Sequence, residues 1–251
     1  MNDVIQWVLV VITGLCFGSF ITAASWRLPR GEDLVKAHSK CPKCSYKLRP
    51  KNLFPVLSWV LSGAKCSGCR AKISVRYPLT EIVTAAIFAF LFSKFGMSWN
   101  FVILAGAAVA ILILIIADFE TYIIPDSTTI ALAILAVVFH VHNGHNFTPF
   151  IYGAGICLGL ALTLKYGYLY LAKKDGMGMG DVKLFPVLGL WIGFKLLPLL
   201  FLFSGVLGIL TSIIWKILFK KEEFPFGPSL VIATYFLVLY PDYFMTILQL
   251  K

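Results

Sequence analysis

Residues 101–117 read FVILAGAAVAILILIIA and contain no charged side chain. A helix rises about 1.5 Å per residue, so a helix of this length crosses most of a hydrocarbon layer about 30 Å thick. Because a surface helix of a water-soluble domain keeps one polar face, this stretch indicates a membrane-spanning helix. The whole chain agrees, since 59% of its 251 residues are hydrophobic and only 14% are charged.

Further apolar runs predict an all-α fold, a polytopic membrane helical bundle with about eight spans. Only helices or closed barrels satisfy backbone amides in lipid, and alternating barrel strands are not seen. The first run has no basic segment before it and no small-residue cleavage site, so we expect it to be a retained span. The sixth run is short for a full crossing, which leaves seven spans as the alternative. The predicted spans are residues 4–24, 78–93, 100–117, 127–142, 149–171, 182–194, 197–217 and 228–248.

The distribution of positive charge predicts the orientation in the membrane, because short cytoplasmic loops are rich in Lys and Arg. With the N-terminus outside, the inner loops are 25–77, 118–126, 172–183 and 218–227. Together with Lys216 they hold 18 of the 22 basic residues, 12 of them in the first loop. The net charge of +10 therefore reflects basic residues concentrated in the predicted cytoplasmic loops. Lipid is the expected surrounding, and no nucleic-acid partner is predicted.

The chain divides into a first transmembrane helix (1–24), a cytoplasmic loop (25–77) and a transmembrane bundle (78–251). The loop is too short for a hydrophobic core of its own. It carries two CxxC pairs, Cys41 with Cys44 and Cys66 with Cys69, whose four thiolates can close a tetrahedral zinc site. Two disulfides are the alternative, but they are rare in the reducing cytosol, and a thioredoxin-like setting is absent. The predicted zinc is structural, because four thiolates leave no open coordination position.

Two acidic residues lie at the same predicted edge of the membrane. Asp118 ends the third span and Asp181 begins the sixth. Acids near hydrocarbon usually face a bundle interior or a wet cavity. Two neighbouring carboxyls share one proton, so one can accept a proton from water while the other polarises a peptide carbonyl. Taken singly, either acid has the alternative role of a helix cap, which is the role expected for Asp126.

The sequence GMGMG at residues 176–180 precedes Asp181 and is expected to be a loop that turns into a helix. Glycine permits positive φ and lets a substrate backbone come close to the Asp181 carboxyl. Gly176, Gly178, Gly180 and Lys183 are the residues predicted to support this loop and the substrate.

The ordered set of motifs resembles that of the bacterial type IV prepilin peptidases, the bifunctional leader peptidases and N-methyltransferases of type IV pilus and type II secretion systems. The motifs are GLCFGSFITAASWRLPRG (14–31), the cysteine quartet, ISVRYPLTE (73–81), DFETYIIPD (118–126), GMGMGDVKL (176–184) and FPFGPSL (224–230). The resemblance implies that Asp118 and Asp181 are the catalytic aspartates of a membrane-embedded aspartic protease. Its expected substrates are prepilins or pseudopilins, cut after a glycine that ends a basic leader. It also implies a bacterial inner-membrane location with the active site at the cytoplasmic face.

The resemblance further implies methylation of the new N-terminus with S-adenosylmethionine as methyl donor. Members of the family commonly read GSFLNV where this chain reads GSFITA, and Thr22 lacks the amide of Asn. Peptidase activity is therefore the main prediction, and methyl transfer stays open. The spacing of Gly14 and Gly18 also suits plain helix packing, and Arg27 suits a positive-inside anchor. The methyl-transfer candidates are Gly18, Ser19, Thr22, Arg27 and Glu81.

Two other functions fit parts of the pattern. A secondary transporter or proton-coupled channel would use the same acids to relay protons or bind a cation, but it predicts acids deep within spans and symmetry between halves. A noncatalytic assembly factor would keep the cysteine loop and tolerate loss of both carboxyls.

Overall fold

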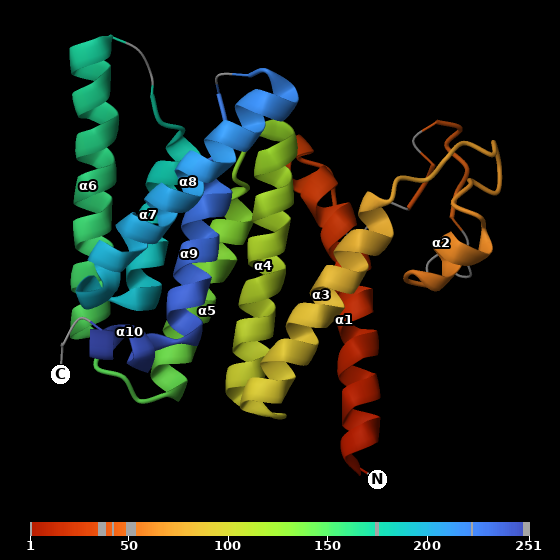
Figure 1. Ribbon diagram of the computed structural model, residues 1–251, viewed down its shortest axis with the longest axis horizontal. Helices are drawn as coiled ribbons and strands as arrows, with labels where there is room; N and C mark the ends of the chain where they lie inside the picture. The colour runs from red at the N-terminus through yellow and green to blue at the C-terminus, as the bar shows by residue number, and fades with distance from the viewer. Residues whose placement is uncertain are drawn as a thin grey trace. The chain divides into compact units, whose positions relative to one another are not determined.

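The computed structural model describes residues 2–34, 39–41, 43–48, 54–173, 176–221 and 223–247. These residues form helices and turns, and their only β pairing is two isolated bridges in the cysteine loop, Lys40 with Lys47 and Lys65 with Lys72. The prediction of an all-α membrane bundle is confirmed (Figure 1). The chain forms two compact units, Met1–Ile116 and Ala117–Lys251.

The first unit is built on α1 (Asn2–Arg27), which packs along α3 (Arg76–Phe95) (Figure 1). A Cβ added at Gly14 would lie 2.6 Å from the Cα of Ala85, and one at Gly18 would overlap the Cα of Glu81. The prediction that these two glycines serve helix packing is therefore confirmed, because a side chain at either position would push α1 and α3 apart. The unit also contains η1 (Leu28–Arg30), the short α2 (Leu57–Leu61) in the cysteine loop, and most of α4 (Trp99–Thr121).

The second unit begins with the last turn of α4 and is centred on α7 (Met179–Ile192). Helix α7 contacts α5, α6 and α9. Its Trp191 indole donates a hydrogen bond to the Leu132 carbonyl of α5 at 3.0 Å. The surrounding elements are α5 (Asp126–His142), α6 (Thr148–Ala172), η3 (Phe194–Leu196), α8 (Leu197–Phe219), α9 (Gly227–Leu239) and α10 (Pro241–Ile247).

Two glycines set the crossing of α6 and α7. A Cβ at Gly153 would lie 2.6 Å from the Gly189 carbonyl oxygen, and a Cβ at Gly189 would overlap the Gly153 carbonyl. The backbones of the two helices therefore touch directly, which is the geometry that small residues allow.

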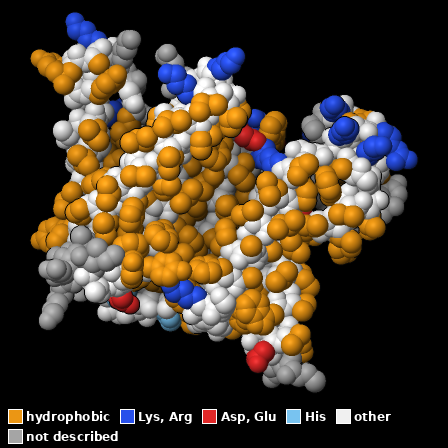
Figure 2. Space-filling view, in the orientation of Figure 1, with side chains coloured by type: hydrophobic (Ala, Val, Ile, Leu, Met, Phe, Trp, Pro, Cys, Tyr) orange, Lys and Arg blue, Asp and Glu red, His pale blue; other side chains and the backbone are white. Residues whose placement is uncertain are grey.

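Five helical segments in the described part of the chain are long and apolar enough to cross a membrane, namely Asp3–Arg30, Arg76–Phe95, Trp99–Thr121, Thr148–Ala172 and Phe194–Phe219. The predicted spans 127–142, 182–194 and 228–248 correspond to shorter helices, so the count of eight is not confirmed. The last of them is interrupted, because α9 ends at Leu239 and α10 starts at Pro241; residue 248 lies outside the described residues. Hydrophobic side chains cover the exposed face of α8 (Figure 2), as expected for contact with lipid.

Candidate active site

The two predicted acids come together within the second unit. Asp118 lies in the last turn of α4 and is only 5% exposed. Asp181 lies in the first turn of α7 and is partly buried. The two carboxyls interact electrostatically. Residues that are far apart in the sequence therefore form one acidic pair.

Each acid lies at the N-terminus of a helix: Asp118 at that of α9, and Asp181 within the first turn of α7. The backbone N–H of Gly227, the first residue of α9, is directed at the Asp118 carboxyl. Asp181 is the third residue of α7, whose N-cap is Gly178, and no side chain caps that helix. Asp181 is therefore not the helix cap, although the positive end of the α7 dipole still favours its negative charge. The sequence alone suggested no role for Gly227. The Gly-Pro pair at 227–228 does indicate a helix start, and it is the signal that could have pointed to this N–H group.

One oxygen of each acid is buried without a hydrogen-bond partner in the described part of the chain. These atoms are Oδ2 of Asp118 and Oδ1 of Asp181. A buried carboxylate oxygen normally has a donor, and leaving it without one costs about 1–3 kcal/mol or more. Each acid of the pair therefore keeps one buried oxygen that could still accept a hydrogen bond.

The glycine-rich segment is a loop that enters α7 at Met179, as predicted. The expectation of positive φ is wrong for Gly178, whose φ is −60°, and for Gly180, which lies within α7. These glycines are needed for space instead. A Cβ at Gly176 would overlap the Tyr168 ring, and one at Gly180 would lie 3.0 Å from the Ile124 Cβ. A Cβ at Gly178 would lie 3.3 Å from Oδ2 of Asp181, so this loop runs directly beside the acid.

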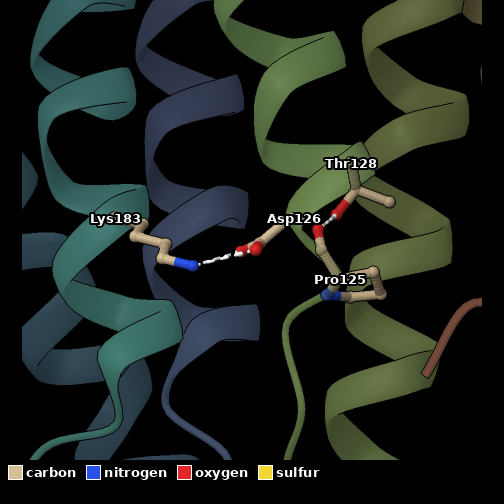
Figure 3. A network of polar contacts seen from close by, with 4 residues as sticks. All are labelled: Pro125, Asp126, Thr128 and Lys183. Atoms are coloured by element: carbon tan, nitrogen blue, oxygen red, sulfur yellow. Dashed lines mark hydrogen bonds and ion pairs between the residues drawn. The ribbon is translucent and has the colours of Figure 1, made fainter. Parts of the chain in front are cut away.

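Lys183 forms an ion pair with Asp126 (Figure 3). Its Nζ lies 2.8 Å from both carboxylate oxygens of Asp126, and the two side chains are 51% and 62% exposed. The expected capping role of Asp126 is wrong, because α5 has Pro125 at its N-cap and no side-chain cap. The Thr128 hydroxyl donates to the Pro125 carbonyl at 2.7 Å. An exposed pair of this kind stabilises a fold by about 1 kcal/mol or less, so its main effect is to link the start of α5 to α7.

Lys165 of α6 is a second cation near the pair. It is only 7% exposed, and its Nζ donates to the Met177 carbonyl at 2.7 Å. Its charge also acts on Asp181. The sequence reasoning gave this residue no site role, although a single Lys within an apolar helix is a recognised signal of function.

The four predicted metal ligands converge within the first unit. The sulfur atoms of Cys41, Cys44, Cys66 and Cys69 all lie within 4.8 Å of one another. Two of the distances, Cys41 to Cys69 and Cys44 to Cys66, are 3.9 Å. Zinc–sulfur bonds of about 2.3 Å in a tetrahedron place sulfurs about 3.8 Å apart, whereas a disulfide would need about 2.05 Å. The four thiols are free, and their geometry fits a zinc ion.

The two CxxC segments have the same local structure. The residue after each second cysteine, Ser45 and Arg70, has φ of 56° and 59°, which turns the chain back. The first cysteine N–H then donates across the turn at 2.9 Å, from Cys41 to Tyr46 and from Cys66 to Ala71. Backbone N–H groups of Cys69 and Gly68 lower the pKa of the Cys66 thiol to about 6, which favours the thiolate that a metal requires. Figure 2 shows Lys and Arg side chains gathered over this loop.

The methyl-transfer candidates separate into two groups. The Glu81 carboxylate accepts a hydrogen bond from the Val56 N–H at 2.6 Å and another from the Ser19 hydroxyl, and Gly18 packs on the Glu81 backbone. Thr22 instead donates to the Ser19 carbonyl within α1 at 2.7 Å. Arg27 donates to the Leu34 carbonyl at 3.0 Å. The structure thus joins Gly18, Ser19 and Glu81, and it directs Thr22 and Arg27 to local backbone partners.

Comparisons with known proteins agree with this arrangement. Residues 12–95 match the bacterial peptidase A24 N-terminal domain, and residues 104–213 match the type IV leader peptidase family. A prepilin leader peptidase/N-methyltransferase of Neisseria gonorrhoeae is 32% identical, covering 90% of this chain and 87% of that protein. Proteins of the same name from Bacillus subtilis and Pseudomonas aeruginosa are 32% and 30% identical, covering 93% and 92% of this chain and 94% and 89% of those proteins. No solved structure shows significant similarity to the chain.

The two family matches extend over both compact units, and the similarity to the relatives runs through nearly the whole chain. The chain belongs to the type IV leader peptidase family, a family of membrane proteases.

Proposed function

We propose that this chain is a membrane-embedded aspartic endopeptidase that removes the basic leader from type IV prepilin or pseudopilin precursors. The proposal rests on one observation above all. The charges of Asp118 and Asp181, two residues remote in the sequence, interact within the second unit, and each acid holds a buried oxygen with no partner among the described residues. The family assignment supports a protease and gives no support to a transporter.

The chemistry follows from the proximity of the two acids. Because two adjacent carboxyls do not readily both ionise, the pair holds one proton between them. The ionised acid accepts a proton from the attacking water, and the protonated acid donates a hydrogen bond to the scissile carbonyl. The proton then passes to the leaving amine, which breaks the carbon–nitrogen bond and restores the pair. The two oxygens without partners have unused hydrogen-bonding capacity for the water and the carbonyl, which must displace neighbouring groups to reach these buried atoms.

The expected cleavage point follows from the position of the acids along their helices. Both lie at helix ends, where a substrate would change from a water-exposed leader to a membrane-embedded helix. Cleavage after a glycine puts no side chain beside the scissile bond, which suits a crowded site. We propose that this end faces the cytoplasm of a bacterial inner membrane, with the N-terminus outside, as the positive charge distribution favours.

The direct test is incubation of the purified protein in detergent with a prepilin precursor, followed by mass spectrometry of the product. We expect loss of the leader, with the cut directly after its last glycine. The same precursor with that glycine replaced by a bulky residue is the control and should remain uncut. Intact precursor after incubation with the unmodified protein would contradict the peptidase proposal.

Methylation of the new N-terminus by S-adenosylmethionine is the second candidate function, favoured because the relatives are named as N-methyltransferases as well as peptidases. The candidate residues do not by themselves fit the cofactor. Both hydrogen-bonding partners of the Glu81 carboxylate belong to the protein, and the Thr22 hydroxyl is bonded within its own helix. The same mass spectra give the result, because a methylated product is heavier than the cleaved product by one methyl group only when the methyl donor is present.

We also propose that the four cysteines hold a structural zinc ion, supported by sulfur spacing close to that of a tetrahedral thiolate site. Held by all four sulfurs, the ion would join the two CxxC turns and leave no position for substrate. The zinc ion would stabilise the fold of a loop that has few apolar contacts.

Zinc content is expected to depend on each thiol of the quartet. The protein purified without chelator should carry about one zinc ion per chain, and Cys66→Ser should reduce this to near zero, because three ligands hold the ion much less tightly. Cys16→Ser is the matched control, since Cys16 is a free thiol of α1 outside the quartet. Metal analysis by atomic emission gives both values. Full zinc occupancy in Cys66→Ser would contradict the assignment.

A further inference from the structure

We propose that Lys165 is a positioning residue of the active site, which holds the glycine loop against Asp181 and fixes Asp181 as the ionised member of the acidic pair. This inference rests on the proposed function and adds an assignment of roles within the pair. It makes Asp181 the acid that accepts the proton from water, and Asp118 the acid that carries the shared proton.

The first argument is the contact with the loop. Lys165 lies in α6, and its Nζ donates to the carbonyl of Met177 at 2.7 Å. Met177 directly precedes Gly178, which is the N-cap of α7 and whose Cβ position lies 3.3 Å from Oδ2 of Asp181. The cation is therefore separated from the acid by one short stretch of backbone. A charged donor on this carbonyl fixes the entry of the chain into α7 more strongly than a neutral one.

The second argument is burial. A Lys side chain that is 7% exposed in an apolar helix is costly, and such a cation is normally retained only with partners that offset the cost. The Met177 carbonyl carries only a partial negative charge, so it offsets part of this cost. The interaction of Lys165 with Asp181 supplies the opposite charge.

The third argument is asymmetry between the two acids. Burial and the negative charge of Asp181 disfavour ionisation of Asp118 more than the Gly227 N–H favours it, whereas the positive charge of Lys165 favours ionisation of Asp181. A cation beside only one of two coupled carboxyls makes the ionised state of that carboxyl the more stable one. The shared proton then resides on Asp118, which is also the more buried acid.

Two electrostatic interactions of the acidic pair join different helices: Lys165 of α6 acts on Asp181, and Asp181 acts on Asp118 at the end of α4. Two further charged groups, Lys183 of α7 and Asp126 at the start of α5, belong to the same unit. Lys183 is paired with Asp126 at 2.8 Å, so its charge is largely neutralised and exposed to solvent. Lys165 is thus a buried cation that acts on Asp181.

The test is the pH dependence of leader cleavage in three substitutions of Lys165. Lys165→Gln keeps a hydrogen-bond donor and removes the charge, Lys165→Met removes both, and Lys165→Arg keeps both. Loss of the cation should shift the acid limb of the kcat/KM profile to higher pH by about one unit in Lys165→Gln and Lys165→Met. On the acid side this is about a tenfold loss of rate. Lys165→Arg should keep the limb near its original position.

The matched control is Lys173→Gln, which removes one positive charge from an exposed residue directly after the same helix. Its acid limb should not move. If Lys165→Met does not fold, Lys165→Gln still decides the question. Lower activity in Lys165→Gln at every pH, with the acid limb unchanged, would show a structural role alone and overturn the assignment. Asn substitutions of the two acids in the same assay keep the two ideas apart, since residual activity there would overturn the aspartic mechanism itself.

Discussion

Asp118→Asn and Asp181→Asn should each abolish leader cleavage, with kcat/KM falling by at least about 10³-fold. Asn has nearly the shape of Asp but neither accepts a proton from water nor donates one to the leaving amine, and a positioned acid or base contributes about 10²–10⁴-fold. The reaction needs an ionised and a protonated carboxyl at the same time, so one acid cannot replace the other. Cleavage of a prepilin by the purified variants, followed over time by electrophoresis, gives the rates.

Glu120→Gln is the matched control for the acids. Glu120 lies two residues after Asp118 in the same last turn of α4, but it is exposed. The Glu120→Gln variant should cleave the prepilin at the normal rate. The Asn variants remove buried charge and should fold at least as well as the original protein, so inactivity will not reflect unfolding. Normal cleavage by either Asn variant would disprove the dyad.

Gly189→Ala should destabilise the second unit by about 2 kcal/mol, which is within the range for forcing a methyl group into a packed interior. The added Cβ would overlap the Gly153 backbone carbonyl of α6, and a backbone cannot rotate away as a side chain can. The helices must separate, and α7 carries Asp181. We therefore expect the thermal midpoint in detergent to fall by several degrees and cleavage to fall with it.

Gly155→Ala in α6 is the control, because a Cβ there meets nothing within 4 Å. In a helix, Ala is more favourable than Gly by about 1 kcal/mol, so this variant should be equal to or more stable than the original. Thermal scans of the two variants under the same conditions give the comparison. Equal midpoints would mean that α6 and α7 do not cross as closely as the structure has them.

Features that depend on neighbouring residues followed directly from the sequence. The apolar runs gave the helices, and the start of α7 fell within three residues of the predicted span. Each CxxC pair is fixed by one local turn, so its spacing already indicated a metal site, and the structure places the four sulfurs accordingly. Asp118 and Asp181 could be selected because carboxyls are rare in such apolar surroundings. The order of the motifs along the chain was sufficient to predict the family.

Features that depend on packing did not follow. Helix α7 is too short to be read as an ordinary span, and only the structure shows that α5, α6 and α9 surround it. The glycines before Asp181 were expected to permit positive φ and the close approach of a substrate. Gly178 and Gly180 do not have positive φ, and Gly176 and Gly180 make space for Tyr168 and Ile124. Asp126 was expected to cap a helix and instead binds Lys183.

The sequence by itself determined that this protein lies in a membrane, that it carries two unusual acids, and that four cysteines can join its loop. Hydrophobicity and short-range spacing are properties of single segments, which is why they can be read along the chain. Tertiary structure decided which groups surround the acids: a helix N-terminus at Asp118, and a buried lysine with its loop at Asp181. Those contacts join residues on different helices, and their energies depend on distance and burial, which no local pattern of residues specifies.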